Sequence, residues 1–209
     1  MKKRVEVIYD IETKKIFDDI STNNPADLGI SIVSAYRREV DELGNEVVGE
    51  MRSFWENEFE QMWSWFEEAD RIIGYNSFGF DNPAMNGVYT KGDFTKLKHF
   101  DILEEIRKVF GHRVKLDSVA KECLGVGKMA DGLDAVRWWS MGDTESLTNL
   151  KKYCEMDVEV TKGVYDFGRK NKRLKFKDRW NEMREIEVDF SYPPEVVPEK
   201  PPEVQMGLF

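Results

Sequence analysis

Carboxylate side chains recur in three segments of the chain that lie far apart in the sequence. These carboxylates are Asp10 with Glu12, then Asp81, and finally Asp157. Carboxylate oxygens are ligands that Mg²⁺ and Mn²⁺ prefer in proteins. If the three segments meet in the folded chain, the carboxylates would repel one another unless cations neutralise them. The sequence therefore predicts a site for two divalent metal ions, Mg²⁺ or Mn²⁺, of the kind that can hold a phosphate group.

The first segment contains two carboxylates with one residue between them. Asp10 and Glu12 lie two residues apart at the end of an expected strand, so both side chains point to the same face and can reach one metal ion. Ile11 points to the opposite face. Solvated Asp-x-Glu pairs are common, so this pair gains its meaning only from the other two segments.

Asp81 lies where one expected strand has ended and an expected helix begins. A carboxylate at such a position can bind a metal ion, or it can cap the helix. Asn76, five residues earlier in the chain, can fix the turn or contact a substrate through its amide. The sequence leaves both pairs of roles open.

Tyr153 and Asp157 are four residues apart in a long expected helix, so they lie on one face together with Leu150 and Val160. An aspartate on an apolar helix face is costly to bury without a cation or another partner. The hydroxyl of Tyr153 lies one helical turn before this carboxylate. We therefore expect Tyr153 to orient a water molecule that attacks a bound phosphate.

The elements that must position these residues follow an α/β order. Three strands come first, and strands then alternate with helices, which is typical of a mixed five-stranded sheet flanked by helices. The expected strands are residues 4–9, 28–36, 46–55, 71–75 and 96–100, and the expected helices are residues 57–69, 81–89, 102–110, 117–124, 133–139 and 144–170. We expect one domain over residues 1–190 and an extended, mobile tail rich in Pro and Glu over residues 191–209.

The composition limits how this protein can contact nucleic acid. Its 209 residues carry a formal net charge of −9, which argues against a broad basic surface for binding nucleic acid. Acidic residues gathered around cations agree with this charge, because bound metal reverses the local potential. No stretch approaches the ~20 apolar residues of a membrane span, and the start of the chain lacks the apolar run of a signal peptide. We expect a cytoplasmic protein.

The three motifs, in this order, resemble those of the DEDD (DnaQ-like) superfamily of 3′–5′ exonucleases. The resemblance implies a ribonuclease H-like fold, with Asp10, Glu12, Asp81 and Asp157 as ligands of two metal ions. It implies hydrolysis of phosphodiester bonds at 3′ ends, with release of nucleoside 5′-monophosphates. Tyr153 four residues before the last Asp resembles the Tyr subgroup, and the first two motifs most resemble the proofreading domain of family B DNA polymerases.

Other residues near the motifs are candidates for binding the substrate. Aromatic rings commonly hold single-stranded ends by stacking on bases. We expect contacts with the substrate, better satisfied by single-stranded DNA than by a duplex, from Thr13, Phe17, Asn76 and Phe80. For the aromatic residues, packing in the core is the alternative interpretation.

The last residues of the chain suggest a protein partner. Gln205, Met206, Leu208 and Phe209 resemble the peptide motif that binds the bacterial sliding clamp. Apolar residues at the end of a solvated tail can fill a pocket on a partner. Such a tether raises the local concentration of the enzyme at replicating DNA and favours a role in replication or repair.

Two other functions fit the same sequence. The first is a 3′–5′ exoribonuclease, because nothing in the motifs tells how a 2′-hydroxyl is treated. The second is a non-catalytic adaptor that binds nucleic acid and the clamp. A missing metal ligand would be the mark of such an adaptor, and all four carboxylates are present.

Overall fold

The central element of the protein is a mixed sheet of five strands in the order β3-β2-β1-β4-β5. The computed structural model describes residues 3–126 and 132–193. Within the sheet, β1 pairs antiparallel with β2 and parallel with β4. The strands are β1 (Arg4–Thr13), β2 (Ile30–Val40), β3 (Glu46–Trp55), β4 (Arg71–Gly74) and β5 (His99–Asp101). The predicted α/β fold with five strands is confirmed.

Strand β1 lies in the middle of the sheet, and both of its faces are covered. Val7, Tyr9 and Ile11 pack into the core on one face, and Ile8 packs into the core on the other. Apolar residues on both faces are typical of an interior strand, and each such side chain contributes about 1.5–3 kcal/mol when fully buried. The strand continues to Thr13, beyond the predicted end at Tyr9. The two carboxylates of the first motif therefore lie within the strand, close to its end.

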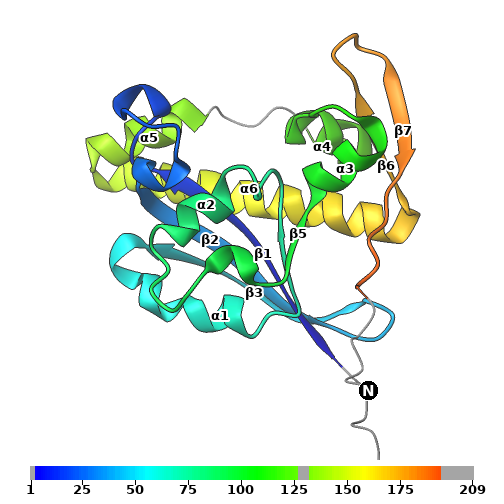
Figure 1. Cartoon of the computed structure of the whole chain (residues 1–209), viewed down its shortest axis with the longest axis horizontal. Helices are drawn as coiled ribbons and strands as arrows, with labels where there is room; N and C mark the ends of the chain where they lie inside the picture. The colour runs from blue at the N-terminus through cyan, green and yellow to red at the C-terminus, as the bar shows by residue number, and fades with distance from the viewer. Residues whose placement is uncertain (1–2, 127–131, 194–209) are drawn as a thin grey trace, which may run out of the picture.

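Helices cover both faces of the sheet (Figure 1). Side chains of α1 and α2 share a core cluster with one face of β1, whereas α3, α4 and α6 share a cluster with the other face. The helices are α1 (Trp63–Glu67), α2 (Asp81–Asn86), α3 (Ile102–Phe110), α4 (Leu116–Leu124), α5 (Gly132–Met141) and α6 (Thr144–Asn171), and short 3₁₀ segments cover Phe17–Asp19, Pro25–Leu28, Glu56–Gln61 and Phe94–Lys96. Among the described residues, no helix is both long and apolar enough to cross a membrane.

The longest helix, α6, has 28 residues and passes across the sheet (Figure 1). It begins at Asp143, whose carboxylate accepts hydrogen bonds from the backbone N–H groups of Glu145 and Ser146. It ends at Lys172, which has the left-handed conformation with φ 58°. The buried face of this helix includes Asp157 near its middle. The helix thus brings the third motif to the face of the sheet that carries the first.

Three predicted elements are shorter or displaced in the structure. The helix predicted over 57–69 is a 3₁₀ segment followed by the short α1, and the Glu58 carboxylate accepts a hydrogen bond from the Trp55 backbone at the start of the 3₁₀ segment. The helix predicted over 81–89 ends at Asn86. The fifth strand lies at His99–Asp101, after a 3₁₀ segment, and not at 96–100.

A second, two-stranded sheet was not predicted. It consists of β6 (Arg173–Lys177) and β7 (Met183–Glu187), which form an antiparallel hairpin beside α4. Leu174 and Phe176 of β6 are fully buried, and charged residues alternate with them. Ser118 and Cys123 of α4 exchange hydrogen bonds with the β6 backbone, which fixes the hairpin to the body of the protein.

Candidate active site

Three carboxylates from two elements converge between β1 and α6. Asp10 and Glu12 come from β1 and Asp157 from α6, and one oxygen of each lies within 4.8 Å of the others. Residues two apart on a strand share a face, and Asp10 and Glu12 face the helix that carries Asp157. Glu12 and Asp157 are buried and Asp10 is half-buried. The structure thus brings together three of the four carboxylates that the sequence singled out as metal ligands.

The fourth carboxylate, Asp81, lines the same cavity, which has a volume of about 320 Å³. Asp81 is the first residue of α2, but the position before it, Phe80, caps the helix without a side-chain hydrogen bond. The carboxylate instead accepts a hydrogen bond from the backbone of Ile11 in β1. The alternative interpretation of Asp81 as a helix cap is therefore wrong.

The turn that leads to Asp81 is organised by Asp101, a residue whose contribution was not predicted from the sequence. One carboxylate oxygen of Asp101 accepts from the backbone of Asn76 at 2.8 Å, and the other accepts from the backbone of Phe78 at 2.9 Å. The same side chain caps α3. Asn76 has φ 64°, the left-handed region that Asn tolerates better than most residues. Asp101 ends β5, the neighbour of β4, so the order of the strands in the sheet brings it to this turn.

Burial raises the pKa values of all four carboxyl groups, and the charges of neighbouring carboxylates raise them further. For Asp10 and Glu12, burial raises the pKa, and the negative charges of Asp157 and Asp81 raise it further. Burial raises the pKa of Asp81 to about 7. Burial also raises the pKa of Asp157 to about 6, although a hydrogen bond from Tyr153 acts in the opposite direction. Without cations, the site therefore resists carrying its full negative charge near neutral pH.

No fixed positive charge offsets these carboxylates. None of them takes part in an ion pair within residues 3–126 and 132–193. The Oδ1 atom of Asp157 is buried and accepts no hydrogen bond from the described residues. Buried charged oxygens without partners are costly unless a ligand supplies the partner. An all-oxygen donor set of this kind fits a hard divalent cation such as Mg²⁺ or Mn²⁺.

Tyr153 lies at the edge of the carboxylate cluster and is half-buried. Its hydroxyl donates a hydrogen bond to Asp157, and its ring packs edge-on against Trp138 of α5 at 6.1 Å between centroids. Burial and the charge of Asp157 raise the pKa of Tyr153. The phenol therefore keeps its proton and can act as a hydrogen-bond donor in the site.

The four predicted substrate-binding residues also line this cavity. Phe17 is 42% exposed, and its ring meets the ring of Phe80 edge-on at 6.1 Å between centroids. Thr13 is buried, and its hydroxyl donates to the Lys15 carbonyl. The side-chain oxygen of Asn76 accepts a hydrogen bond from Arg113 at 2.8 Å, so this residue helps to fix the turn. Of the four, Phe17 offers the most open surface to a substrate.

Helix α5 adds a wall of the cavity that was not predicted from the sequence. Leu133 and Val136 come from this helix, and Leu133 is 62% exposed. An exposed leucine at the start of an amphipathic helix gave no sign in the sequence that it borders the acidic residues. The predicted partner-binding residues Gln205, Met206, Leu208 and Phe209 lie outside the described residues.

A family model of the RNase H superfamily matches residues 7–167 of this chain. The chain belongs to the RNase H superfamily. The matched region begins in β1 and ends in α6, so it contains all four carboxylates and Tyr153. No curated protein matches the chain. Nucleases of the RNase H superfamily use divalent metal ions and act on nucleic acid, which agrees with the acidic cluster of this member.

Proposed function

We propose that this RNase H superfamily member is a 3′–5′ exonuclease of the DEDD type, Tyr subgroup. In this proposal it hydrolyses phosphodiester bonds at the 3′ ends of single-stranded DNA and releases nucleoside 5′-monophosphates. The observation that carries the proposal is the meeting of Asp10, Glu12 and Asp157 oxygens within 4.8 Å, where none of the three forms an ion pair with another described residue. Asp81 and Tyr153 at the same place complete the residue set.

The carboxylates of Asp10, Glu12, Asp81 and Asp157 would hold two Mg²⁺ or Mn²⁺ ions. When bound, such ions neutralise the carboxylates, activate water and stabilise the oxygen that leaves the phosphorus. The hydrogen bond that Asp81 accepts from Ile11 and the one that Asp157 accepts from Tyr153 orient these two carboxylates. The remaining oxygens are free to face the ions.

Tyr153 has a separate task in the proposed reaction. Because its pKa is raised by burial, its hydroxyl stays protonated and can hold the attacking water in line with the scissile bond. The packing of its ring against Trp138 limits how far the phenol can move. The released product carries the phosphate on its 5′ oxygen.

The preference for an unpaired 3′ end rests on the aromatic residues of the cavity. The exposed ring of Phe17, supported by Phe80, can stack on a terminal base. Stacking of this kind contributes about 1–3 kcal/mol for each base and needs a base that is not paired. Thr13 and Asn76 border the same cavity and would limit how the terminal nucleotide sits.

The division of the chain and its recruitment are also proposals. We propose that residues 1–190 form the nuclease domain and that residues 191–209 form a tail whose Gln205, Met206, Leu208 and Phe209 bind a sliding clamp. This suggestion and the expected cytoplasmic location rest on the sequence alone. Clamp recruitment would raise the local concentration of the enzyme at DNA ends during replication or repair.

The test uses single-stranded DNA that carries a fluorescent label at its 5′ end. With Mg²⁺, the wild-type protein is expected to shorten the strand stepwise from its 3′ end, to release nucleoside 5′-monophosphates and to stop when EDTA is added. Asp157→Asn is expected to lower the rate about 10³-fold or more, because it removes a metal ligand. Glu159→Gln is the matched control, because Glu159 is an exposed residue of the same helix.

The pattern of products separates the proposal from its alternatives. Loss of the 5′ label as the first product, or cuts inside the strand, would contradict a 3′–5′ exonuclease. Equal activity of Asp157→Asn and wild type would refute the site. A matched RNA strand decides between DNA and RNA as the substrate, because faster shortening of RNA would favour the exoribonuclease.

A further inference from the structure

A second cavity lies beside the acidic site, between α4 and the tip of the β6–β7 hairpin. Its volume is about 770 Å³. We call it the basic groove, because five cationic side chains line it against three acidic ones. The cationic residues are Arg113, Lys115, Lys121, Lys177 and Arg179, and the acidic residues are Asp117, Glu122 and Asp178. This excess of positive charge contrasts with the net charge of −9 of the whole chain.

The positive charges of the basic groove are not neutralised by salt bridges of the described residues, although Arg113 also donates a hydrogen bond to Asn76. None of the five forms an ion pair with another residue of the described ranges, 3–126 and 132–193. Arg113, Lys115, Lys121 and Arg179 are exposed. By contrast, Lys98 and Lys108, which line a different cavity, are paired with Asp70 and Glu105. Unpaired cations gathered in one groove provide a surface that attracts phosphate groups.

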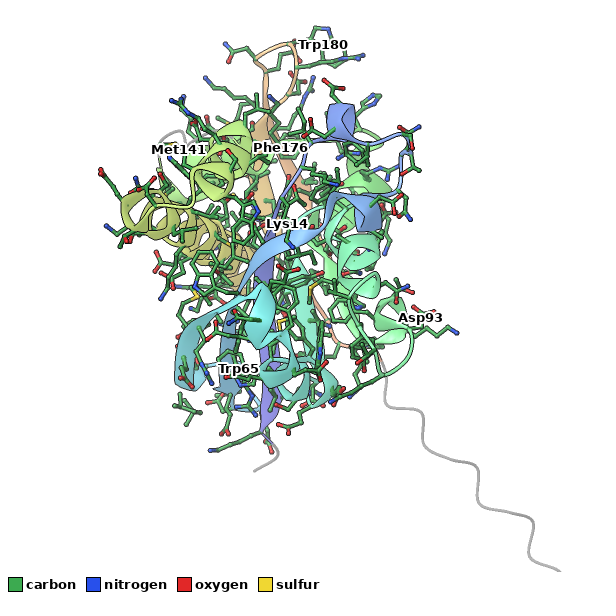
Figure 2. All side chains as sticks on the ribbon, turned by 90° about the vertical axis from the view of Figure 1, so that its left-hand side faces the viewer. Lys14, Trp65, Asp93, Met141, Phe176 and Trp180 are labelled. Carbon is green, nitrogen blue, oxygen red and sulfur yellow. The ribbon has the colours of Figure 1, made fainter. Side chains whose placement is uncertain are left out.

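The hairpin presents an aromatic ring next to these cations. Trp180 is 58% exposed and lies at the tip of the hairpin (Figure 2). Its position is fixed by Asp178, whose carboxylate accepts hydrogen bonds from the backbone of Trp180 and Glu182 and from the Arg184 side chain. The guanidinium of Arg179 lies over the Trp180 ring at 4.0 Å from its centroid. An indole held outside the core in this way is a surface on which an unpaired base can stack.

The basic groove is directly connected to the acidic site. Arg113 lines the groove and donates a hydrogen bond to Asn76, which lines the acidic cavity. Val114 of the groove accepts a hydrogen bond from Tyr75 of that cavity at 2.8 Å. These hydrogen-bonded residues form a wall between the two cavities.

We propose that the basic groove binds the unpaired nucleic-acid strand that leads away from the 3′ end held in the acidic site, with phosphates on the cations and a base on Trp180. This proposal rests on the proposed exonuclease function for the position of the 3′ end. It adds a second contact region that the catalytic residues do not provide. The groove thereby makes binding depend on the length of the strand.

The test measures binding without cleavage, by fluorescence anisotropy of labelled single strands in EDTA. Strands of about 20 nucleotides can occupy both regions, whereas strands of about 4 nucleotides fill only one. We expect Lys121→Glu/Arg179→Glu and Trp180→Ala each to weaken binding of the long strand about tenfold and to change binding of the short strand less than twofold. The double variant should also lower the slope of log affinity against log salt by about 0.7 for each phosphate that the protein no longer neutralises.

The control variant is Lys98→Glu/Lys108→Glu, which makes the same change in net charge at a different cavity. An equal loss of affinity in this control, or unchanged binding of the long strand by both groove variants, would overturn the proposal. Binding of a poly-glutamate peptide that competes with the long strand and depends on the same residues would assign the groove to an acidic protein and overturn it as well. Circular dichroism of each variant verifies that it is folded.

The same experiment distinguishes failure of the groove from failure of the exonuclease. Binding is measured without metal, so an inactive protein whose affinity depends on the groove would contradict only the exonuclease. An active exonuclease whose affinity does not depend on the groove would contradict only the present inference. In an active enzyme, the groove variants should raise KM for the long strand about tenfold and leave kcat unchanged, because they do not touch the scissile bond.

Discussion

Strand β1 carries carboxylates at two places on the face that it turns towards α6. The two groups differ in whether a positively charged side chain is paired with them. Near the start of the strand, Glu6 is fully buried and meets Arg38 of β2 at 2.7 Å, and Arg38 also binds Asp166 of α6. Further along, Asp10 and Glu12 meet a third carboxylate, Asp157 of α6, and the uncharged thiol of Cys154 donates to Asp10 at 3.9 Å. The same strand and helix therefore contain one compensated and one uncompensated group of charges.

The difference shows where a ligand is needed. At the compensated end, the hydroxyls of Tyr165 and Tyr192 donate to Glu6, so its charge has partners on all sides. The pKa of Asp166 is lowered, since its hydrogen bonds with Arg38 outweigh the opposing effect of burial. At the other end, burial raises the pKa of Asp10, and neighbouring carboxylates raise it further. A fold that can place an arginine beside Glu6 leaves the second group open to cations from solution.

The largest expected effect concerns the compensated end. Arg38→Met should lower the free energy of unfolding by about 3–5 kcal/mol, because it leaves Glu6 charged and buried without its cation. The activity of the molecules that remain folded should not change, since Arg38 does not border the acidic cavity. Urea denaturation monitored by circular dichroism measures the first effect, and nuclease assays well below the melting temperature measure the second.

A double variant tests the cause of this loss. Glu6→Gln/Arg38→Met removes both charges, so it should recover a part of the stability that Arg38→Met alone loses. Additive losses in the double variant would show that the pair contributes by shape and not by charge. Glu6 and Arg38 are direct cross-strand partners in the register of β1 and β2, so the two substitutions affect one contact.

The elements that sequence patterns predicted well are those with a local cause. The strand Glu46–Trp55 and the helix Ile102–Phe110 have the predicted bounds, since alternation and helical spacing are properties of neighbouring residues. The hairpin of β6 and β7 was missed, because contacts with Ser118 and Cys123 of α4 hold it in place. Nothing within residues 173–187 reveals those partners.

The candidate site shows the same limit. The spacing of Asp10 to Glu12 on a strand and of Tyr153 to Asp157 on a helix gave the correct faces, since both periods are local. The contribution of Asp101 depends on its hydrogen bond to Asn76, 25 residues earlier in the chain, and no pattern in the sequence describes such a contact. Asp117 is the second residue of α4, after the capping position Lys115, and, besides burial, its negative charge raises the pKa of Asp157, which lies 40 residues later in the chain.

The second-largest expected effect is a dependence of the free energy of unfolding on pH, which arises from the carboxylates at the uncompensated end. Without divalent metal, the free energy of unfolding should fall as the pH rises from about 4 to 7, by roughly 1.4 kcal/mol for each unit by which a pKa is raised. Mg²⁺ at about 100 times its Kd should restore about 2.7 kcal/mol at pH 7. Urea denaturation at several pH values, with EDTA and with Mg²⁺, measures both changes.

Stability falls as the pH rises because the pKa values of these carboxyl groups are raised in the folded chain. The pKa values of Asp157, about 6, and Asp81, about 7, lie above the ordinary value of 3.8, so the folded chain binds these protons more tightly. The resulting stability is fully present below pH 3.8 and is lost as the pH rises through the raised values. Asp166, with its lowered pKa, acts in the opposite direction and loses its contribution as the pH falls below 3.8. Asp157→Asn should flatten the decline between pH 4 and 7, and an unchanged slope would contradict the shift.

The smallest expected effect concerns Tyr153. It distinguishes the role of this residue from that of the carboxylates that would bind the metal ions. Tyr153→Phe keeps the ring that packs against Trp138 and removes the hydroxyl that donates to Asp157. We expect kcat to fall about tenfold, the cost of one hydrogen bond to a charged group, and the stabilisation by Mg²⁺ to stay unchanged. Tyr36→Phe is the control, because it removes a hydroxyl bonded to Glu46 on β3, outside the cavity. Wild-type kcat in Tyr153→Phe would show that the phenol does not orient the water, and a parallel loss of Mg²⁺ binding would make it a support of Asp157 alone.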